Sequence, residues 1–372
     1  KLGSRDRRFL AETVYDVVRW KGFLEGVRGK PVEDETGIAA VWAIYEVWKN
    51  DREVASQIEE VFHIKTNIPS VENIKGQLST SSNLNAHQKH SFPRWLYDKF
   101  EQDYGAETEA LLSSLNKPAP VCLRVNTLKT DRKALQALLA QEEIIADPSP
   151  ETESCLILKE RKNVFITKPY KEGLFEVQDE ASQWIGKLLD PKPGERVADM
   201  CAGAGGKTLH LAALMQNKGT LLACDVSENK LNQLKIRSRR AGVSNLRIQP
   251  IKSTKDFKRQ VETFDAVLID SPCSGTGVIR RNADTKWKLT PEDYQDLLKT
   301  QEDILSQYSR LVKPGGRLLY ATCSLLKDEN EKQVTAFLAK NPNFEKLGKS
   351  FVRRPDKDGQ DGFFAQLLTR RQ

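Results

Sequence analysis

The chain has 372 residues, of which 39% are hydrophobic, enough to build the cores of two or three domains. It has no apolar run near the ~20 residues that a membrane-spanning helix needs. Its six cysteines form no CxxC pair and no metal-spaced cluster with histidine, so we expect no disulfide framework and no metal, and a reducing, cytoplasmic compartment. The formal net charge of +7 suits a polyanionic partner such as nucleic acid.

The first 85 residues are expected to form a small helical bundle. Apolar residues recur there at helical spacing in three stretches, and we interpret each stripe as the core-facing side of a helix. The stripes are Leu10, Val14, Val17 and Val18; Val41, Ile44, Tyr45 and Trp48; and Val54, Ile58, Val61 and Phe62. Residues 79–92 are polar and are expected to be a linker, followed by a helix that opens at residues 92–96.

From residue 121 the pattern changes to a small α/β module that ends near residue 171. Residues 121–125 and 155–158 are predicted strands. Between them, Asp131 is a plausible cap for a helix that carries Leu135, Leu138 and Leu139.

From about residue 173 strands and helices alternate regularly. Strands are predicted at residues 196–200, 220–224, 246–249, 266–270 and 317–321, with a final strand near residues 363–368 after a long helix at residues 329–339. Alternation at this spacing indicates a parallel sheet covered by helices on both faces, a doubly wound α/β fold. Ligands of such folds bind outside the carboxyl ends of the strands.

A glycine-rich loop follows the first of these strands. Gly206-Lys207-Thr208 fits the end of a phosphate-binding P-loop, but Cys201 stands where that motif needs its first glycine. The dinucleotide fingerprint fails on spacing, so a nucleoside cofactor remains. Asp225 ends the next strand about 20 residues later, which suits the two hydroxyls of a ribose.

Two thiols and an acid follow two other strand ends. Asp270 and Cys273 come after the fourth strand, and Cys323 comes after the fifth. A lone buried cysteine is usually structural. Two thiols in matching loops, one of them beside an acid, favour a catalytic role instead. Beyond Cys273, cations interleaved with an aromatic side chain suit a nucleic-acid backbone and a stacked base: Arg280, Arg281, Lys286 and Trp287.

Several ordered motifs resemble the Sun (Fmu) family of RNA cytosine-C5 methyltransferases, over residues 90–372. The resemblance rests on residues 270–275 (Asp-Ser-Pro-Cys-Ser-Gly), residues 321–324 (Ala-Thr-Cys-Ser), residues 123–127, residues 177–182, the glycine loop and residues 361–364. Residues 3–8 and the helix to Trp20 resemble the NusB-like helical domain of the RsmB branch. The expected fold is therefore a Rossmann-like methyltransferase sheet behind a small α/β subdomain and an all-α N-terminal region.

The resemblance also implies a cofactor, S-adenosylmethionine, and roles for individual residues. Cys323 matches the nucleophile that adds to cytosine carbon 6, Cys273 the thiol that helps to release the product, Asp270 the acid at the ring edge and Lys207 the lysine near the base. The cofactor residues are assigned as Cys201, Ala202, Gly203, Ala204, Gly205, Gly206, Lys207, Asp225, Lys230 and Asp270. Arg124 and Asn126 join the four residues above as RNA contacts.

The chain departs from the family pattern at three places. Gly203 and Ala204 stand where the family usually has Ala and Pro, and Asn282 stands where it usually has His. Residues 251–253 lack the usual adenine-contacting Asp, so adenine recognition is expected to fall to Ser253, a backbone group or Asp256.

The sequence thus predicts a monomeric enzyme that methylates carbon 5 of a cytosine in ribosomal RNA, with small-subunit 16S rRNA favoured by the RsmB-like front end. Two alternatives stay open, a tRNA substrate and a catalytically idle RNA-binding assembly factor on the same fold. The predicted domains are a NusB-like helical region (1–85), a small RNA-binding subdomain (86–171) and the catalytic domain (172–372).

Overall fold

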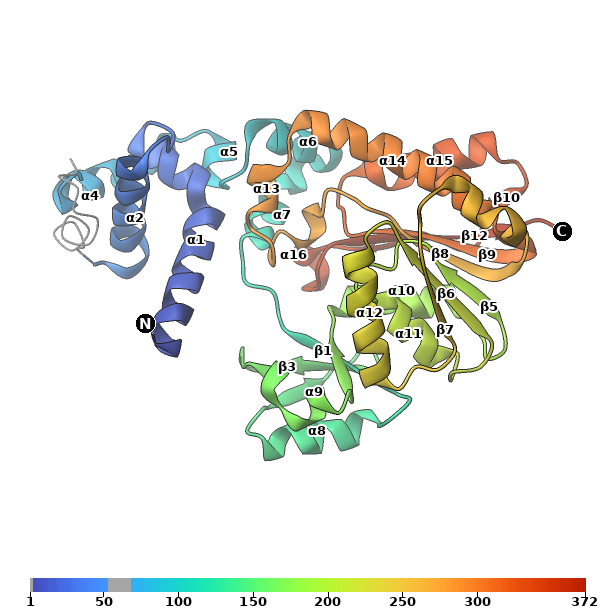
Figure 1. Cartoon of the computed structure of the whole chain (residues 1–372). Coiled ribbons are helices and arrows are strands. Elements are labelled where there is room, and N and C mark those ends of the chain that lie inside the picture. Colours follow the sequence, from blue (N-terminus) through green and yellow to red (C-terminus); the bar gives the residue numbers. More distant parts are fainter. Residues whose placement is uncertain (1–2, 53–67) are drawn as a thin grey trace. The chain divides into compact units, whose positions relative to one another are not determined.

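The computed structural model describes residues 3–52 and 68–372, and the chain divides into two compact units (Figure 1). One unit, called here the helical unit, comprises residues 1–117 and 279–291, and the other comprises residues 118–278 and 292–372. This division differs from the predicted domains, whose boundaries at residues 85 and 171 stay predictions. The third predicted apolar stripe, Val54, Ile58, Val61 and Phe62, lies outside the described residues.

The helical unit has a core made by its first helices, in which Leu24, Ile44 and Ile74 are almost fully buried. Its elements are α1 (Ser4–Arg28), α2 (Glu35–Asn50), α4 (Val71–Ser79), η1 (Ser81–Asn83), α5 (Ala86–Lys89), α6 (Arg94–Tyr104), η2 (Gly105–Glu107), α7 (Thr108–Leu115) and α13 (Thr285–Lys288). Helix α2 begins where the Asp34 carboxylate accepts the Gly37 N–H at 2.7 Å.

Two predictions for this region need correction. Among the described side chains of α1, those from Val17 onward join the core, whereas Leu10 and Val14 are 45% and 58% exposed, so the first stripe faces the core along only half of its length. The predicted linker at residues 79–92 contains η1 and α5 instead. Polar side chains can stabilise the start of a helix, and at α5 the Asn85 N–H donates to Gln88 Oε1.

Residues 279–291 are held in the helical unit by polar contacts to α1 and to the end of α7. Trp287 Nε1 donates to the Val18 carbonyl at 2.7 Å, and Arg19 donates to the Arg280 carbonyl at 3.1 Å. Lys286 is fully buried over the Phe92 ring. Its ammonium donates to Asn116 Oδ1 at 2.9 Å, and burial together with the Arg19 cation lowers its pKa well below the usual range.

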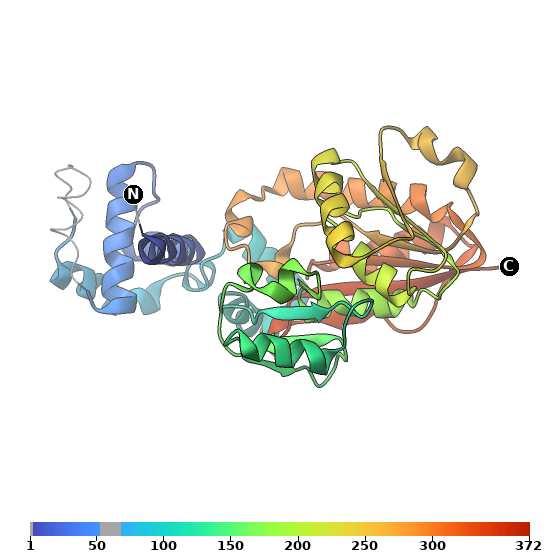
Figure 2. The ribbon, with the colours of Figure 1, turned by 60° about the horizontal axis from the view of Figure 1, so that its bottom comes forward.

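In the second unit, residues 118–177 build a four-stranded antiparallel sheet in the order β2-β3-β1-β4, drawn in blue-green and green in Figure 2. Its elements are β1 (Cys122–Val125), α8 (Arg132–Gln141), β2 (Ala146–Pro148), β3 (Cys155–Leu158), η3 (Val164–Ile166), α9 (Lys168–Lys171) and β4 (Phe175–Val177). Both predicted strands and the Asp131 cap, which accepts the Ala134 N–H, are confirmed. The module ends later than predicted, because β4 pairs with β1.

The rest of this unit is an eight-stranded sheet in the order β10-β12-β9-β8-β5-β6-β7, with β11 beside β12. The strands β9, β8, β5, β6 and β7 pair in parallel with their neighbours. Strand β12 pairs antiparallel with each of its neighbours, β9, β10 and β11. The strands are β5 (Arg196–Asp199), β6 (Thr220–Asp225), β7 (Leu246–Pro250), β8 (Phe264–Asp270), β9 (Val312–Thr322), β10 (Phe344–Lys346), β11 (Phe351–Arg353) and β12 (Phe363–Arg370). All six predicted strands are present.

Helices cover both faces of this sheet, as expected for a doubly wound fold (Figure 1). One face packs on α10 (Glu180–Leu189), α11 (Gly206–Leu214) and α12 (Glu228–Ala241), and the other on α14 (Pro291–Ser309) and α15 (Glu331–Lys340). Short helices complete the unit: η4 (Thr254–Gln260), η5 (Thr276–Val278), η6 (Lys327–Glu329) and α16 (Pro355–Asp358). The strand order reverses between β5 and β8, so the binding crevice is expected at their carboxyl ends.

None of the helices in residues 3–52 and 68–372 has the length and hydrophobicity required to span a bilayer.

Candidate active site

The glycine loop joins the end of β5 to the start of α11. Gly205 directly precedes α11 and has a φ of 91°. A Cβ atom there would lie 2.2 Å from Leu234 Cδ1, so the turn requires glycine. The first N–H groups of a helix have no partner within the helix. The loop therefore presents backbone donors and little side-chain bulk at the carboxyl edge of the sheet, which suits a nucleoside ligand.

Asp225 meets this loop from the end of β6. Its carboxylate accepts hydrogen bonds from the N–H groups of Gly203 and Ser227, each at 2.8 Å. Acid and glycine loop are thus adjacent, the arrangement that binding of ribose hydroxyls needs. Lys230, which the sequence assigns to the cofactor, is exposed on the first turn of α12.

The segment after β7, where the family pattern is broken, forms a turn around Asp256. The Asp256 carboxylate accepts the N–H groups of Lys252 at 2.9 Å and Ser253 at 2.8 Å. Asp256 therefore stabilises the turn itself, although both it and Ser253 are exposed.

The two thiols lie side by side. Strands β8 and β9 pair in parallel with Asp270 opposite Ala321, which brings the loops after both strands together. The Sγ atoms of Cys273 and Cys323 are 3.4 Å apart, and both residues are partly exposed. The hydrogen bond with Cys323, together with burial, raises the pKa of the Cys273 thiol well above its usual range. Cys273 therefore keeps its proton at neutral pH.

A buried carboxylate, Glu329, links the two thiol loops. It accepts the Ser274 N–H at 2.7 Å and the Ser274 hydroxyl at 2.5 Å, and it also accepts the Ser324 hydroxyl. Gln301 Nε2 adds a fourth hydrogen bond at 2.9 Å. Ser274 follows Cys273 and Ser324 follows Cys323, so one side chain fixes the residue next to each thiol.

A contact between two glycines brings a third loop to the same place. The Gly277 N–H donates to the Cys323 carbonyl, and the Gly362 N–H donates to the Gly277 carbonyl, each at 2.9 Å. A Cβ at Gly277 would lie 2.1 Å from the Gly362 carbonyl oxygen. The loops that carry Cys273, Cys323 and residues 361–364 can approach this closely only because both positions lack a side chain.

Lys207 and Asp270 form an ion pair at this edge of the sheet. Lys207, in the first turn of α11, lies 2.6 Å from Asp270 Oδ2, and its ammonium is 5.2 Å from the centre of the Phe363 ring. Burial opposes the charge of Lys207, but Asp270 outweighs it and raises the lysine pKa, with a smaller contribution from the Cys323 sulfur. Lys207 and Cys323 thus interact electrostatically at this edge of the sheet.

Asp199, at the end of β5, is a buried acid below the glycine loop. Its Oδ2 accepts the Thr208 hydroxyl at 2.7 Å, and the carboxylate also has a hydrogen bond with the backbone of Cys201. Burial raises its pKa to about 7, although the Thr208 hydrogen bond partly opposes the shift.

The residues predicted to contact RNA are mostly inside the protein, which corrects that interpretation. Arg124, Asn126, Arg280 and Lys286 are at most 8% exposed. Asn126 Nδ2 donates to the carbonyls of Gly173 and Ala241, and the partners of Arg124 are also protein groups. Only Arg281 and Trp287 of the predicted set are partly exposed, so these four buried side chains are withdrawn from the RNA surface.

Sequence reasoning missed Glu329 and Arg237. Glu329 lies six residues after Cys323 in a charged stretch that resembles a solvated helix start, and Arg237 lies in a run of cations that resembles an exposed face. Arg237 in fact donates to the Ala204 carbonyl of the glycine loop at 2.7 Å. No signal in a single sequence separates such buried charges from exposed ones.

The doubly wound sheet, the glycine loop, the ribose-type acid and the strand-end site define a Rossmann-like methyltransferase. The match to a model of the 16S rRNA methyltransferase RsmB/F family covers residues 186–369, and a ferredoxin-like domain of the same group of proteins matches residues 92–165. The chain belongs to the RsmB/F family. It is therefore an enzyme, with S-adenosylmethionine as its cofactor.

Individual relatives agree with this assignment. A probable ribosomal RNA small subunit methyltransferase B from Synechocystis is 32% identical, with 91% of this chain and 82% of the relative covered. The ribosomal RNA small subunit methyltransferase B of Yersinia pseudotuberculosis is 33% identical over 78% of this chain and 69% of its own. The crystal structure of a methyltransferase homologue from Pyrococcus horikoshii is 30% identical, covers 78% of this chain and 99% of that chain, and superposes with a TM-score of 0.69.

Proposed function

We propose that this enzyme methylates carbon 5 of a cytosine in 16S rRNA through a covalent bond between Cys323 and the base. The observation that carries the proposal is the pair of thiols, 3.4 Å apart, at strand ends next to the Lys207–Asp270 ion pair. The names of the small-subunit rRNA methyltransferases to which the chain is similar support ribosomal RNA as the substrate. The proposed compartment is the cytoplasm, and the proposed form is a monomer.

The thiol pair answers a specific chemical need. Carbon 5 of cytosine is a poor nucleophile, and a thiolate bonded to carbon 6 makes carbon 5 electron-rich, like the carbon of an enamine. Cys323 Sγ forms that bond, and Lys207 stabilises its thiolate beforehand. Asp270 holds the ring edge at nitrogen 3. The cofactor supplies an electrophilic methyl group on a sulfonium, which carbon 5 takes up.

The adduct must then break down. The proton on carbon 5 leaves to a base, its bonding electrons form the double bond between carbons 5 and 6, and the electrons of the carbon–sulfur bond return to Cys323 Sγ. We assign the base to Cys273 as its thiolate. In the free enzyme the hydrogen bond with Cys323 keeps Cys273 protonated. Once Cys323 is bonded to carbon 6 of the cytosine, it no longer has this hydrogen bond with Cys273. That cause of the raised Cys273 pKa is then gone, and the proton of Cys273 can pass to solvent.

The fit of the cofactor rests on the glycine loop and on Asp225. The glycines allow the ligand to approach the backbone of the loop closely. Asp225 lies next to the loop, where its carboxylate can accept hydrogen bonds from the ribose hydroxyls.

Two single substitutions test the proposal. Cys323→Ala removes the nucleophile, so methyl transfer to 16S rRNA should be lost, as measured with a labelled cofactor and by bisulfite mapping. Cys273→Ala should complete methylation but accumulate RNA bound covalently to Cys323, seen as a denaturant-resistant complex on a gel. Cys122→Ala, a buried cysteine of β1 away from both thiol loops, is the matched control and should form no complex.

Full turnover of Cys273→Ala without a trapped complex would sink the assignment of the second thiol. Methylation of tRNA in preference to 16S rRNA would shift the substrate to the tRNA alternative. Failure of the intact chain to methylate either RNA would favour an assembly factor on the same fold.

A further inference from the structure

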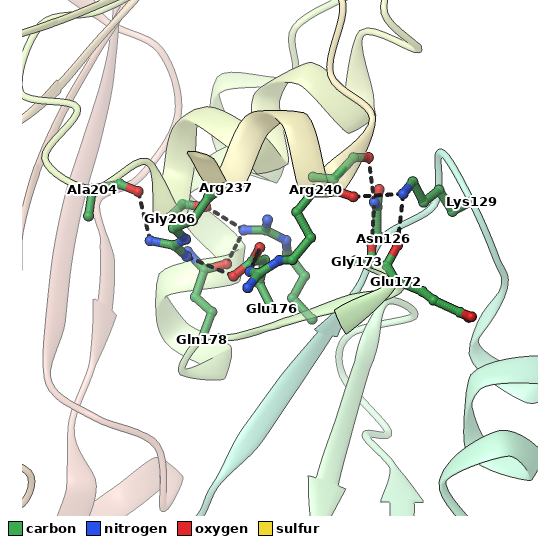
Figure 3. A network of polar contacts seen from close by, with 12 residues as sticks. Asn126, Lys129, Glu172, Gly173, Glu176, Gln178, Ala204, Gly206, Arg237 and Arg240 are labelled. Carbon is green, nitrogen blue, oxygen red and sulfur yellow. Dashed lines mark hydrogen bonds and ion pairs between the residues drawn. The ribbon is translucent and has the colours of Figure 1, made fainter. Parts of the chain in front are cut away.

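A cluster of buried and half-buried charges lies outside the thiol site, between the four-stranded sheet and α12 (Figure 3). We call it the arginine cluster; it consists of Arg124 on β1, Glu176 on β4, and Arg237 and Arg240 on α12. Arg124 and Glu176 are 3% and 4% exposed. Arg237 and Arg240 form ion pairs with Glu176, and burying such charges is costly unless hydrogen bonds satisfy them.

Two of these arginines satisfy their donors on the glycine loop. Arg237 Nη1 donates to the Ala204 carbonyl at 2.7 Å, and Arg124 Nη1 donates to the Gly206 carbonyl at 2.5 Å. Figure 3 shows both carbonyls facing the cluster. Ala204 and Gly206 flank Gly205, the residue whose positive φ makes the turn. The arginines therefore hold the turn at both ends through its carbonyl oxygens.

Glu176 in turn fixes the arginines. It accepts Arg237 Nη2 at 2.8 Å and Arg240 Nη2 at 2.5 Å. Arg124 also donates to the side-chain oxygen of Gln178, whose own amide donates to Ser182 at 3.1 Å. Both β4 and β1 thus contribute polar groups that converge on a loop of the other sheet.

We propose that Arg124 and Arg237 are positioning residues for the cofactor. Hydrogen bonds from outside to the carbonyls of Ala204 and Gly206 keep the loop in the one conformation that turns its N–H groups toward S-adenosylmethionine. Cofactor affinity then depends on the four-stranded sheet, although Arg124 and Glu176 lie in a different sheet from the glycine loop. This inference rests on the cofactor of the family and not on the thiol chemistry.

Arg240 provides a matched control inside the same cluster. It shares Glu176 with Arg237, but its guanidinium lies over the Tyr170 ring at 4.0 Å, and its described contacts do not include the glycine loop. Loss of either arginine weakens the packing of α12 on β4. Only loss of Arg237 also frees the Ala204 carbonyl.

The test compares Arg237→Gln, Arg237→Lys and Arg240→Gln in the full-length chain. The dissociation constant of S-adenosylmethionine is measured by calorimetry without RNA, together with thermal stability. A charged hydrogen bond is worth enough for Arg237→Gln to weaken cofactor binding by about tenfold or more. Arg240→Gln should lose about as much stability as Arg237→Gln but bind S-adenosylmethionine within about twofold of the native affinity. The affinity of Arg237→Lys should lie between those of the two Gln variants.

The inference is overturned if Arg237→Gln keeps native affinity, or if both Gln variants lose affinity equally, which would indicate a general structural role. If Arg237→Gln fails to fold, the cofactor affinities of Arg237→Lys and Arg240→Lys are compared instead. The inference is then overturned if Arg237→Lys keeps native affinity or if both Lys variants lose affinity equally. Hydrogen exchange of the amides at residues 202–206 gives a second readout, and faster exchange is expected only when Arg237 is changed. Because cofactor binding is measured without methyl transfer, a failure of the thiol assignment would leave these results interpretable.

Discussion

The glycine loop and the thiol loops are both held by buried charges, but by charges of opposite sign. Arginines hold the glycine loop through its carbonyls, from the four-stranded sheet and from α12. A carboxylate, Glu329 of η6, holds the thiol loops through an N–H and two hydroxyls. In each case the charge binds the groups that the chemistry does not need.

The difference follows from what each loop must keep available. A loop that binds a nucleoside needs its N–H donors, so cations on its carbonyls constrain it without competing. A loop that carries thiols must keep both sulfur atoms accessible, and a carboxylate on the neighbouring serines does so. A cation in that place would also shift the protonation of the thiols. The sign of the supporting charge thus matches the role of the loop.

The largest expected effect is that of Glu329→Gln. Loss of the shared carboxylate releases Ser274 and Ser324 independently, and small misplacement of reacting groups costs about 10²-fold in rate. We expect kcat to fall by about that factor, with the KM for S-adenosylmethionine unchanged. Phenylarsine oxide, which bridges close thiol pairs, should bind the variant more slowly.

Glu176→Gln is the crossed control for this comparison. It should raise the KM for S-adenosylmethionine and leave the reaction of the thiol pair with the arsenical unchanged. A Glu329→Gln enzyme with kcat within twofold of the native value would break the comparison on the thiol side.

A smaller effect is expected from Gly277→Ala. Its Cβ would lie 2.1 Å from the Gly362 carbonyl oxygen and 2.8 Å from the Cys323 carbonyl oxygen, so backbone must move. Overpacking of this kind typically costs about 1–3 kcal/mol, measurable by urea unfolding, and activity should fall with it. Gly76→Ala in α4, where a Cβ meets no atom of the described residues within 4 Å, is the control and should leave stability equal or slightly higher. Native stability of Gly277→Ala would argue against the glycine contact.

The most gradual effect concerns Asp199 and pH, because it is spread over the range between two pKa values. Its pKa is about 7 in the folded chain against an ordinary value of 3.8, so the folded state holds the proton that the unfolded state releases. Stability should therefore fall as pH rises from about 4 to about 7, by at most about 1.4 kcal/mol per pH unit. Urea unfolding at a series of pH values should show this slope in the native chain and a flatter one in Asp199→Asn. Identical slopes would mean that Asp199 ionises freely in the fold.

The parallel sheet and the thiol edge could be predicted from the sequence because their signals are local. Apolar runs that end in Asp199, Asp225 or Asp270 mark both the strand and its functional end. Adjacency of Cys273 and Cys323 follows from the pairing of consecutive strands, which is confirmed. The resemblance in these motifs added the family, which the comparisons confirm.

The supporting charges could not be predicted, because burial of a charged residue depends on partners far away in sequence. Arg124 reaches a carbonyl 82 residues later, and Asn126 reaches one 115 residues later. By sequence alone both resemble exposed polar residues near an RNA-binding surface. Leu10 and Val14 of α1, which are exposed, are the converse case, since helical periodicity shows which residues share a face but not whether another element covers it.

The contribution of residues 279–291 to the helical unit bears on how this protein can be divided. That unit is formed by two separate stretches of chain, so no single cut releases it intact. A fragment that begins at residue 118 would lose Asn116, the acceptor of the fully buried Lys286 ammonium. Exchange of helical units between related enzymes would have to carry residues 279–291 along, although they begin only six residues after Cys273 in the sequence.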